Sequence, residues 1–212
     1  MSLQQLFGLD GRTALVTGGS SGIGRAIASA LADAGAHVLV AARTEATIDD
    51  TVATIRRDGG SADGIVADLS SRAGAHALAD AASDVDVLVN SAGINLRPTM
   101  AELDEDTWDA TMAVNLDAPF VLGQRLAPGM AARGHGRIIS ISSQQAHRPF
   151  AASGAYGVSK AGRGPAAGSG PTRQRRAGRA GGERHWPGPK QRPGPGRGSP
   201  PTSSSPVSCG HR

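Results

Sequence analysis

The 212-residue sequence is poor in aromatic residues and in cysteine: Phe, Trp and Tyr make up 3% of it, and Cys209 is its one cysteine. A single cysteine cannot form an internal disulfide, which excludes a secreted domain built on disulfides. No apolar run approaches the ~20 residues that a membrane-spanning helix requires. The N-terminal residues MSLQQLFGLDG lack the basic and apolar regions of a secretory signal. We therefore expect a cytoplasmic protein with no membrane partner.

Acidic residues are almost absent from the last 50 positions. Residues 1–162 hold 12 Lys and Arg against 17 Asp and Glu, a net charge of −5, whereas residues 163–212 hold ten basic residues and only Glu183, a net charge of +9. The pI of about 10.2 therefore reflects the C-terminal segment and says nothing about partners of the first part. The sequence predicts two parts, residues 1–162 and 163–212.

Residues 1–162 alternate apolar runs with stretches of helical spacing. The predicted strands are Thr13–Thr17, His37–Ala42, Ile65–Ala67, Val85–Asn90 and Arg137–Ser142. The predicted helices are Ile23–Ala34, Ala46–Asp58, Ala73–Ala82 and Asp104–Arg133, the last interrupted by Pro119 and Pro128. Apolar strands separated by helices are typical of a parallel sheet that is buried on both faces. This pattern predicts a Rossmann-like, doubly wound α/β fold with helices on both faces.

A glycine-rich turn, TGGSSGIG at Thr17–Gly24, joins the first strand to the first helix. Glycines let the backbone approach a pyrophosphate closely, and the free N–H groups at a helix N-terminus favour an anion. A plain tight turn is the alternative interpretation of such a segment. The predicted nucleotide contacts in this turn are Gly18, Ser20, Ser21, Gly22, Ile23 and Gly24.

Tyr156 and Lys160 are four residues apart, so they share one face of a helix. An ammonium group one turn away favours the phenolate, which makes Tyr156 a better general acid/base. Ser143, 13 residues earlier, is placed to donate a hydrogen bond to a substrate oxygen and to stabilise its charge. Alone, the Tyr–Lys pair would be an ordinary exposed helical pair; with Ser143 and the glycine turn it indicates catalysis.

Together these elements resemble the short-chain dehydrogenase/reductase family over residues 7–162. The turn has the family's TGxxxGxG spacing, and the stretch from Asn90 to Gly93, NSAG, is similar to its NNAG element. The resemblance implies an oxidoreductase that transfers hydride between NAD(P)(H) and an alcohol or ketone, normally as a homo-oligomer. It further implies that Asp68 contacts the adenine ring, that Asn115 holds a water in a proton relay and that Lys160 also binds the nicotinamide ribose. The other cofactor contacts that it implies are Asn90, Ala92, Gly93 and Tyr156.

The residue at the end of the second strand bears on the choice of cofactor. An acidic residue there would accept hydrogen bonds from the ribose hydroxyls of NAD(H). In this sequence Ala42 occupies the position instead, and Arg43 comes next. Because an arginine can pair with a 2′-phosphate, the sequence favours NADP(H) over NAD(H). NAD(H) stays open, since Ser21 stands where many NADP(H)-using members have a second basic residue. No metal is predicted.

Polar side chains near the expected mouth of the cleft favour a small hydroxy or keto substrate. Gluconate-5-dehydrogenase-like and 3-oxoacyl-carrier-protein-reductase-like members of the family are both similar here, and the sequence does not separate them. The polar residues concerned are Asn95, Arg97, Gln144, Gln145 and His147.

Residues 163–212 contain 11 Gly, 9 Pro, 9 Arg and 6 Ser, a composition that predicts a disordered tail. The sequence motif of the family's sixth strand, VNAIxPG, is not found in these residues. If Gly182–Gly188 is encoded GGT-GAA-CGC-CAT-TGG-CCC-GGN, a shift of one nucleotide yields Val-Asn-Ala-Ile-Gly-Pro. We therefore hypothesise that the reading frame is lost near Gly162–Gly164. Sequencing the gene across codons 158–170 tests this, and an in-frame reading through Arg212 would contradict it.

Two functional alternatives follow from the tail. A genuine Arg/Gly-rich tail would bind RNA through phosphate attraction and stacking, but Trp186 is its one aromatic residue and it has no regular RGG repeat, so no nucleic acid partner is expected. An out-of-frame tail would leave a sheet without its last strands and a compromised oligomer. The chain would then be an inactive fragment, at most a nucleotide-binding module, with poor or no turnover.

Overall fold

The computed structural model describes residues 7–148 and 150–162. They contain a five-stranded sheet in the order β3-β2-β1-β4-β5, in which every pair of neighbouring strands is parallel. The strands are β1 (Thr13–Thr17), β2 (His37–Ala42), β3 (Ser61–Val66), β4 (Val87–Asn90) and β5 (Arg137–Ser140).

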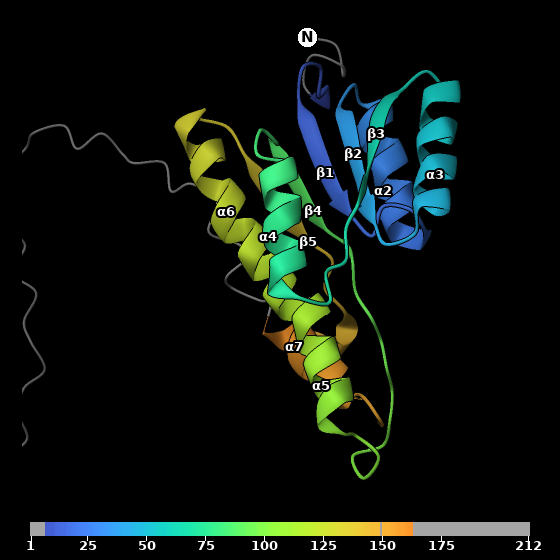
Figure 1. Ribbon diagram of the computed structural model, residues 1–212, viewed down its shortest axis with the longest axis vertical. Coiled ribbons are helices and arrows are strands. Elements are labelled where there is room, and N and C mark those ends of the chain that lie inside the picture. Colours follow the sequence, from blue (N-terminus) through green and yellow to red (C-terminus); the bar gives the residue numbers. More distant parts are fainter. Residues whose placement is uncertain (1–6, 149, 163–212) are drawn as a thin grey trace, which may run out of the picture. The chain divides into compact units, whose positions relative to one another are not determined.

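Helices cover both faces of this sheet (Figure 1). The helices α2 (Gly22–Asp33) and α3 (Glu45–Arg57) pack on one face, and α4 (Arg72–Ala81) and α6 (Ala118–Ala132) pack on the other. The remaining helical segments are α5 (Glu105–Met112), η1 (Ala113–Asp117), η2 (Gln144–Ala146) and α7 (Gly154–Ala161).

Alternation along the central strand divides the core into two layers. Val16 of β1 belongs to the cluster under α2 and α3, whereas its neighbour Leu15 belongs to the cluster under α4 and α6. Leu15 pairs in register with Leu39 of β2 and Leu88 of β4. Burial on both faces explains why β1 and β4 are continuous apolar runs. The predicted doubly wound α/β fold is confirmed.

The strand order places a crevice at the carboxyl ends of β1 and β4. From β1 the chain proceeds outward to β2 and β3, then crosses to the other side of β1 to form β4 and β5. The loops that follow β1 and β4 therefore leave in opposite directions. Ligands of open α/β sheets bind at such a switch point.

The third strand is longer than predicted. It begins at Ser61 and ends at Val66, and it pairs with β2 from His37–Ser61 to Ala42–Val66. Only Ala62 of this edge strand is fully buried, so its first four residues lack the apolar signal on which the prediction of Ile65–Ala67 depended. The ladder does reach the predicted end, because the Ala67 amide donates to the Ala42 carbonyl (2.8 Å).

The prediction that both prolines interrupt the helical stretch 104–133 is wrong. Pro119 is the second residue of α6 and Pro128 lies inside it. The irregularity comes earlier, in the π-helical turn η1 between α5 and α6. A π turn shifts the backbone hydrogen bonds by one residue, and Pro119, which has no N–H to donate, lies two residues after its end.

The predicted tail, residues 163–212, lies outside the described residues, so its disorder and its reading frame stay predictions. None of the helices in residues 7–148 and 150–162 combines the length and the apolar character needed to cross a bilayer.

A buried threonine joins the carboxyl ends of β1 and β4. The Thr17 hydroxyl donates to the Val89 carbonyl (3.3 Å) and accepts from the amides of Ser91 and Ala92 (both 3.2 Å). Thr17 is 1% exposed. One hydroxyl thus serves three backbone groups at the point where the two strands separate.

Replacing Thr17 by valine should destabilise the protein by about 1–3 kcal/mol, because the Ala92 amide loses its acceptor and the Val89 carbonyl loses the hydroxyl that donates to it. Thr17→Ser keeps the hydroxyl and serves as the control, with a loss of less than about half that amount expected. Urea denaturation followed by circular dichroism measures both variants. Equal stabilities of the valine and serine variants would show that the hydroxyl does not hold this junction.

Candidate active site

The turn between β1 and α2 leaves no room for side chains at two of its glycines. A Cβ on Gly18, whose φ is +65°, would lie 2.9 Å from the Ala92 Cα, and a Cβ on Gly24 would lie 2.1 Å from the Gly18 carbonyl oxygen. A Cβ on Gly22 would instead meet no atom within 4 Å. The turn therefore packs closely on the segment after β4, while the N-terminus of α2 and its free N–H groups stay uncovered.

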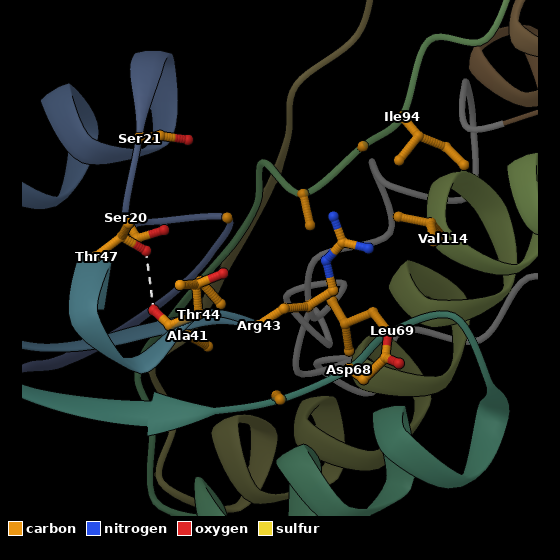
Figure 2. Close-up of a pocket in the computed structure, with 15 residues that line it drawn as sticks. Ser20, Ser21, Ala41, Arg43, Thr44, Thr47, Asp68, Leu69, Ile94 and Val114 are labelled. Atoms are coloured by element: carbon orange, nitrogen blue, oxygen red, sulfur yellow. Dashed lines mark hydrogen bonds between the residues drawn. The ribbon is translucent and has the colours of Figure 1, made fainter.

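A cavity of about 330 Å³ lies at the carboxyl ends of β1 to β4 (Figure 2). Its walls come from the glycine turn and from the segments that follow β2, β3 and β4. This is the place that the switch point predicts for a ligand. The sequence-predicted residues that line it are Gly18, Ser20, Ser21, Arg43, Asp68, Ala92 and Gly93.

Arg43 and Asp68 are the charged residues of this cavity wall. Figure 2 shows the Arg43 side chain extending from the end of β2 into the cavity. The pKa of Asp68 is lowered, first by hydrogen bonds from Ser70, whose amide donates at 2.9 Å, and to a smaller extent by the charge of Arg43. Asp68 is therefore an acceptor at neutral pH, and Arg43 is a donor available to an anion.

Four other predicted cofactor residues surround the cavity without lining it. Asn90, at the end of β4, is buried, as is Gly24 in α2. Ile23, in the first turn of α2, is 63% exposed although it is a large apolar residue. With Gly22, it presents an open surface beside the glycine turn.

Asn115 lies in the π turn and is fully buried. Its side-chain carbonyl accepts from the Ile94 amide (2.9 Å), and its side-chain NH₂ donates to the Ile94 carbonyl (2.9 Å) and to the Ser159 hydroxyl (3.0 Å). The amide thus connects the segment after β4 to α7. A π turn inside an α-helix frequently marks a functional position.

Ser159 is a site residue that the sequence analysis missed. Its hydroxyl donates to the Tyr156 carbonyl (2.8 Å), so it can only accept from Asn115, which fixes the orientation of the Asn115 amide. Ser159 is fully buried. Its place three residues after Tyr156, inside the Tyr–Lys motif, was the available signal, since positions i and i+3 of a helix share a face.

Lys160 lies between the cavity and Tyr156. Its ammonium donates to the Ile141 carbonyl (3.1 Å) and lies 5.5 Å from the centre of the Tyr156 ring. A Cβ on Gly93 would lie 3.5 Å from the Lys160 Nζ and 3.2 Å from the Asn115 Oδ1. Gly93, which lines the cavity, is therefore the point where the cavity and the Tyr–Lys pair meet.

Ser143 follows β5 and begins the short helix η2. Its hydroxyl accepts from the Gln145 amide (3.2 Å), which leaves its own proton available to another acceptor. The carbonyl of Gln145 lies 3.7 Å from where a Cβ on Gly157 would be, so η2 packs against the helix that carries Tyr156. Ser143 and Tyr156 thus belong to adjoining segments at the carboxyl side of the sheet.

The residues predicted at the cleft mouth lie on two loops. Asn95 and Arg97 follow β4 and are exposed; Gln144 and His147, also exposed, follow β5. Gln145 is half-buried, and its Oε1 has no hydrogen-bond partner among the described residues. Both loops therefore carry acceptor and donor groups.

These features define a class of protein: a doubly wound α/β fold with a glycine-rich turn between β1 and α2 and a Tyr–Lys pair close to the segment that follows β4. The family model described as "short chain dehydrogenase" matches residues 12–164. The chain belongs to the short-chain dehydrogenase/reductase family.

Curated relatives match the chain over the same region. Dehydrogenase/reductase SDR family member 4 of Bos taurus is 37% identical over 157 residues, 72% of this chain and 56% of the relative. D-threitol dehydrogenase of Mycolicibacterium smegmatis is 38% identical over 166 residues, 73% of this chain and 64% of the relative. The chain thus spans only 56% and 64% of the length of these two relatives.

Solved structures show the same fold with a nucleotide bound. A 3-oxoacyl (acyl-carrier-protein) reductase from Agrobacterium tumefaciens with NADP bound superimposes with a TM-score of 0.73 at 39% identity, covering 76% of this chain and 64% of that chain. A gluconate 5-dehydrogenase from Burkholderia cenocepacia in complex with NADP and tartrate superimposes with a TM-score of 0.68 at 36% identity, covering 76% and 65%.

The Asn115–Ser159 hydrogen bond can be measured by a double-mutant cycle. Asn115→Ala and Ser159→Ala should each destabilise the protein by about 1–3 kcal/mol, because each leaves buried polar groups unpaired. The double variant should lose at least about 0.5 kcal/mol less than the sum of the two. Urea denaturation supplies the three free energies, and Ser159→Thr, which keeps the hydroxyl, is the control. Additive losses would mean that the two side chains are not coupled.

Proposed function

We propose that residues 7–162 bind NADP(H) and carry the proton-transfer groups of an oxidoreductase that interconverts an alcohol and a ketone. The proposal depends chiefly on the junction at Gly93. This glycine lines the nucleotide cavity and lies against Lys160 and Asn115. A dinucleotide in the cavity would therefore extend toward the Tyr–Lys pair.

The residues present fit a dinucleotide. The uncovered N-terminus of α2 suits a pyrophosphate, and the open surface beside Gly22 leaves space for it. Ser20 and Ser21 line the same end of the cavity, and Asp68 lies at the end formed by β3, where the adenine would bind. Lys160 would hold the nicotinamide ribose. When bound, the nicotinamide supplies or accepts the hydride.

The chain's own residues would handle the proton. In the oxidising direction, as the carbinol carbon loses its hydride and the C=O bond forms, the carbinol O–H proton would pass to Tyr156. Ser143 would donate a hydrogen bond to the same oxygen and stabilise its charge. Lys160 would favour the phenolate form of Tyr156. Asn115 would hold a water that carries the proton onward.

A second candidate function is nucleotide binding without turnover. Among the described residues β5 is an edge strand, and Ile139 of β5 and Val158 of α7 are 46% and 52% exposed. The helix α7 has eight residues, too few to be stable without packing. Poorly covered apolar side chains beside it would let Tyr156 and Lys160 lose their positions while the cavity between β1 and β3 stays formed.

The position of Arg43 predicts a preference for the phosphorylated cofactor. Arg43→Ala should weaken NADPH binding roughly 10- to 100-fold, the effect of one lost charge-assisted hydrogen bond. Binding of NADH should change less than about threefold. Titration of the full chain, followed by the fluorescence of the reduced nicotinamide, measures both constants. Equal losses for the two cofactors would mean that Arg43 does not contact the 2′-phosphate.

Substitution of Tyr156 separates the two candidate functions. Tyr156→Phe should bind NADPH as the wild type does and lower ketone-dependent NADPH oxidation at least ~100-fold, because the general acid is lost. The measurement is absorbance at the nicotinamide band with a panel of ketones and the purified full chain. If the wild type binds NADPH and oxidises it no faster than Tyr156→Phe, the second candidate is correct.

A further inference from the structure

A buried threonine of α3 lies against the glycine turn. Thr51 is 1% exposed, and its hydroxyl shares its proton between two carbonyl oxygens, that of Thr47 at 3.0 Å and that of Ser20 at 3.4 Å. Thr47 lines the cavity from α3, and Ser20 lines it from the glycine turn. Thr51 thus joins two walls of the cavity from behind, without lining it itself.

The orientation of the Ser20 carbonyl depends on Thr51. Thr47 lies inside α3, where each carbonyl also accepts from the amide four residues further on. The Ser20 carbonyl accepts from no backbone amide of the described residues, so the Thr51 hydroxyl is its one hydrogen-bond partner among them. Without this hydroxyl, the peptide that follows Ser20 would lose the contact that fixes its plane.

The same peptide carries the N–H of Ser21. None of the described peptide bonds is cis, and in a trans peptide the carbonyl and the N–H point in opposite directions. A Ser20 carbonyl that is held against α3 therefore turns the Ser21 N–H away from α3. Ser21 is exposed and lines the cavity, and within the described residues its N–H has no acceptor. It is one of the free N–H groups that the start of α2 offers to a phosphate.

Arg25 keeps α3 in place for this contact. Its backbone N–H donates to the Ser21 carbonyl (3.0 Å) in the first turn of α2. Its guanidinium donates to two side chains of α3, the Asp50 carboxylate (2.7 Å) and the Thr54 hydroxyl (3.1 Å). Asp50 and Thr54 lie on either side of Thr51 in the sequence, so Arg25 fixes the stretch of α3 that carries the Thr51 hydroxyl.

We propose that Thr51 is a positioning residue for the cofactor: its hydroxyl holds the Ser20–Ser21 peptide so that the Ser21 N–H is ready to donate to the phosphates of a bound dinucleotide. A donor that is already oriented need not be ordered when the anion binds, which is the advantage of preorganisation. The inference rests on the proposed function, because it takes the diphosphate to lie at the start of α2. The effect of Thr51 should therefore appear in binding of the diphosphate and not in binding of the adenosine.

ADP and adenosine differ only in the diphosphate, so the ratio of their affinities measures its contribution. Both are titrated by calorimetry into the full chain. The wild type should bind ADP at least roughly tenfold more tightly than adenosine, the value of one charge-assisted contact. Thr51→Val, which replaces the hydroxyl by a methyl group, should lower this ratio at least about threefold and change adenosine binding less than about twofold. A general loss of stability would instead weaken both ligands equally.

Thr111→Val is the matched control. Thr111 is fully buried in α5, and its hydroxyl donates to the Thr107 carbonyl one turn back (2.8 Å), as that of Thr51 does in α3, but among the described residues it reaches no second element. This variant and Thr51→Ser, which keeps the hydroxyl, should each leave the ratio within about twofold of the wild type. An unchanged ratio in Thr51→Val, or an equal fall in either control, would overturn the positioning role.

Arg25→Gln supplies a second test if circular dichroism shows that Thr51→Val does not fold. It frees α3 from α2 at a half-exposed position and should lower the same ratio at least about twofold; no change would count against the inference. NADPH binding is measured separately by nicotinamide fluorescence. A wild type that binds NADPH but holds ADP no more tightly than adenosine contradicts the positioning role alone. A wild type that binds neither NADPH nor ADP contradicts the proposed function, and the inference with it.

Discussion

The buried amide of Asn115 connects the two halves of this site. It binds both backbone groups of Ile94, in the segment that follows β4, and it reaches Ser159 in the helix that carries Tyr156. A fully buried amide must satisfy its donors and its acceptor, or it costs about 1–3 kcal/mol per unpaired group. The arrangement therefore has one favourable geometry, and in that geometry Lys160 lies beside Gly93, which lines the cavity.

The parts of the molecule that could be predicted from sequence are those that local chemistry determines. The bounds of the buried strands β1 and β2 could be predicted from the sequence, because burial on both faces leaves apolar residues at successive positions. The glycine turn could also be predicted, since it needs glycine at Gly18 and Gly24, where a Cβ would collide with the backbone. The residues that line the cavity from this turn and from the ends of β2 and β3 follow from the same pattern.

The parts that could not be predicted depend on contacts between distant segments. The start of β3 has no apolar signal, and its pairing with β2 alone makes Ser61 to Gly64 a strand. Ser159 is polar and looks like a surface residue until Asn115, 44 residues away along the chain, is placed against it. The hydrogen bond from the Arg97 guanidinium to the Ala151 carbonyl spans 54 positions. Neither partner of such a pair identifies the other, because sequence spacing encodes only neighbours within one helix or strand.

The two halves of the site differ in what holds them. The cavity that we propose for the nucleotide is bounded by turns packed on β1, the middle strand of the sheet, so the close contacts of the glycine turn and a buried core fix its shape. Tyr156 and Lys160 stand on an eight-residue helix that is held by the Asn115–Ser159 bond, by the Ile141 carbonyl and by packing on η2. Helices of that length have little stability of their own, and elements with few buried contacts open first. Nucleotide binding should therefore withstand perturbations that already abolish proton transfer. The two proposed functions then differ only in whether α7 keeps its place, since the cavity is the more stable part of the site.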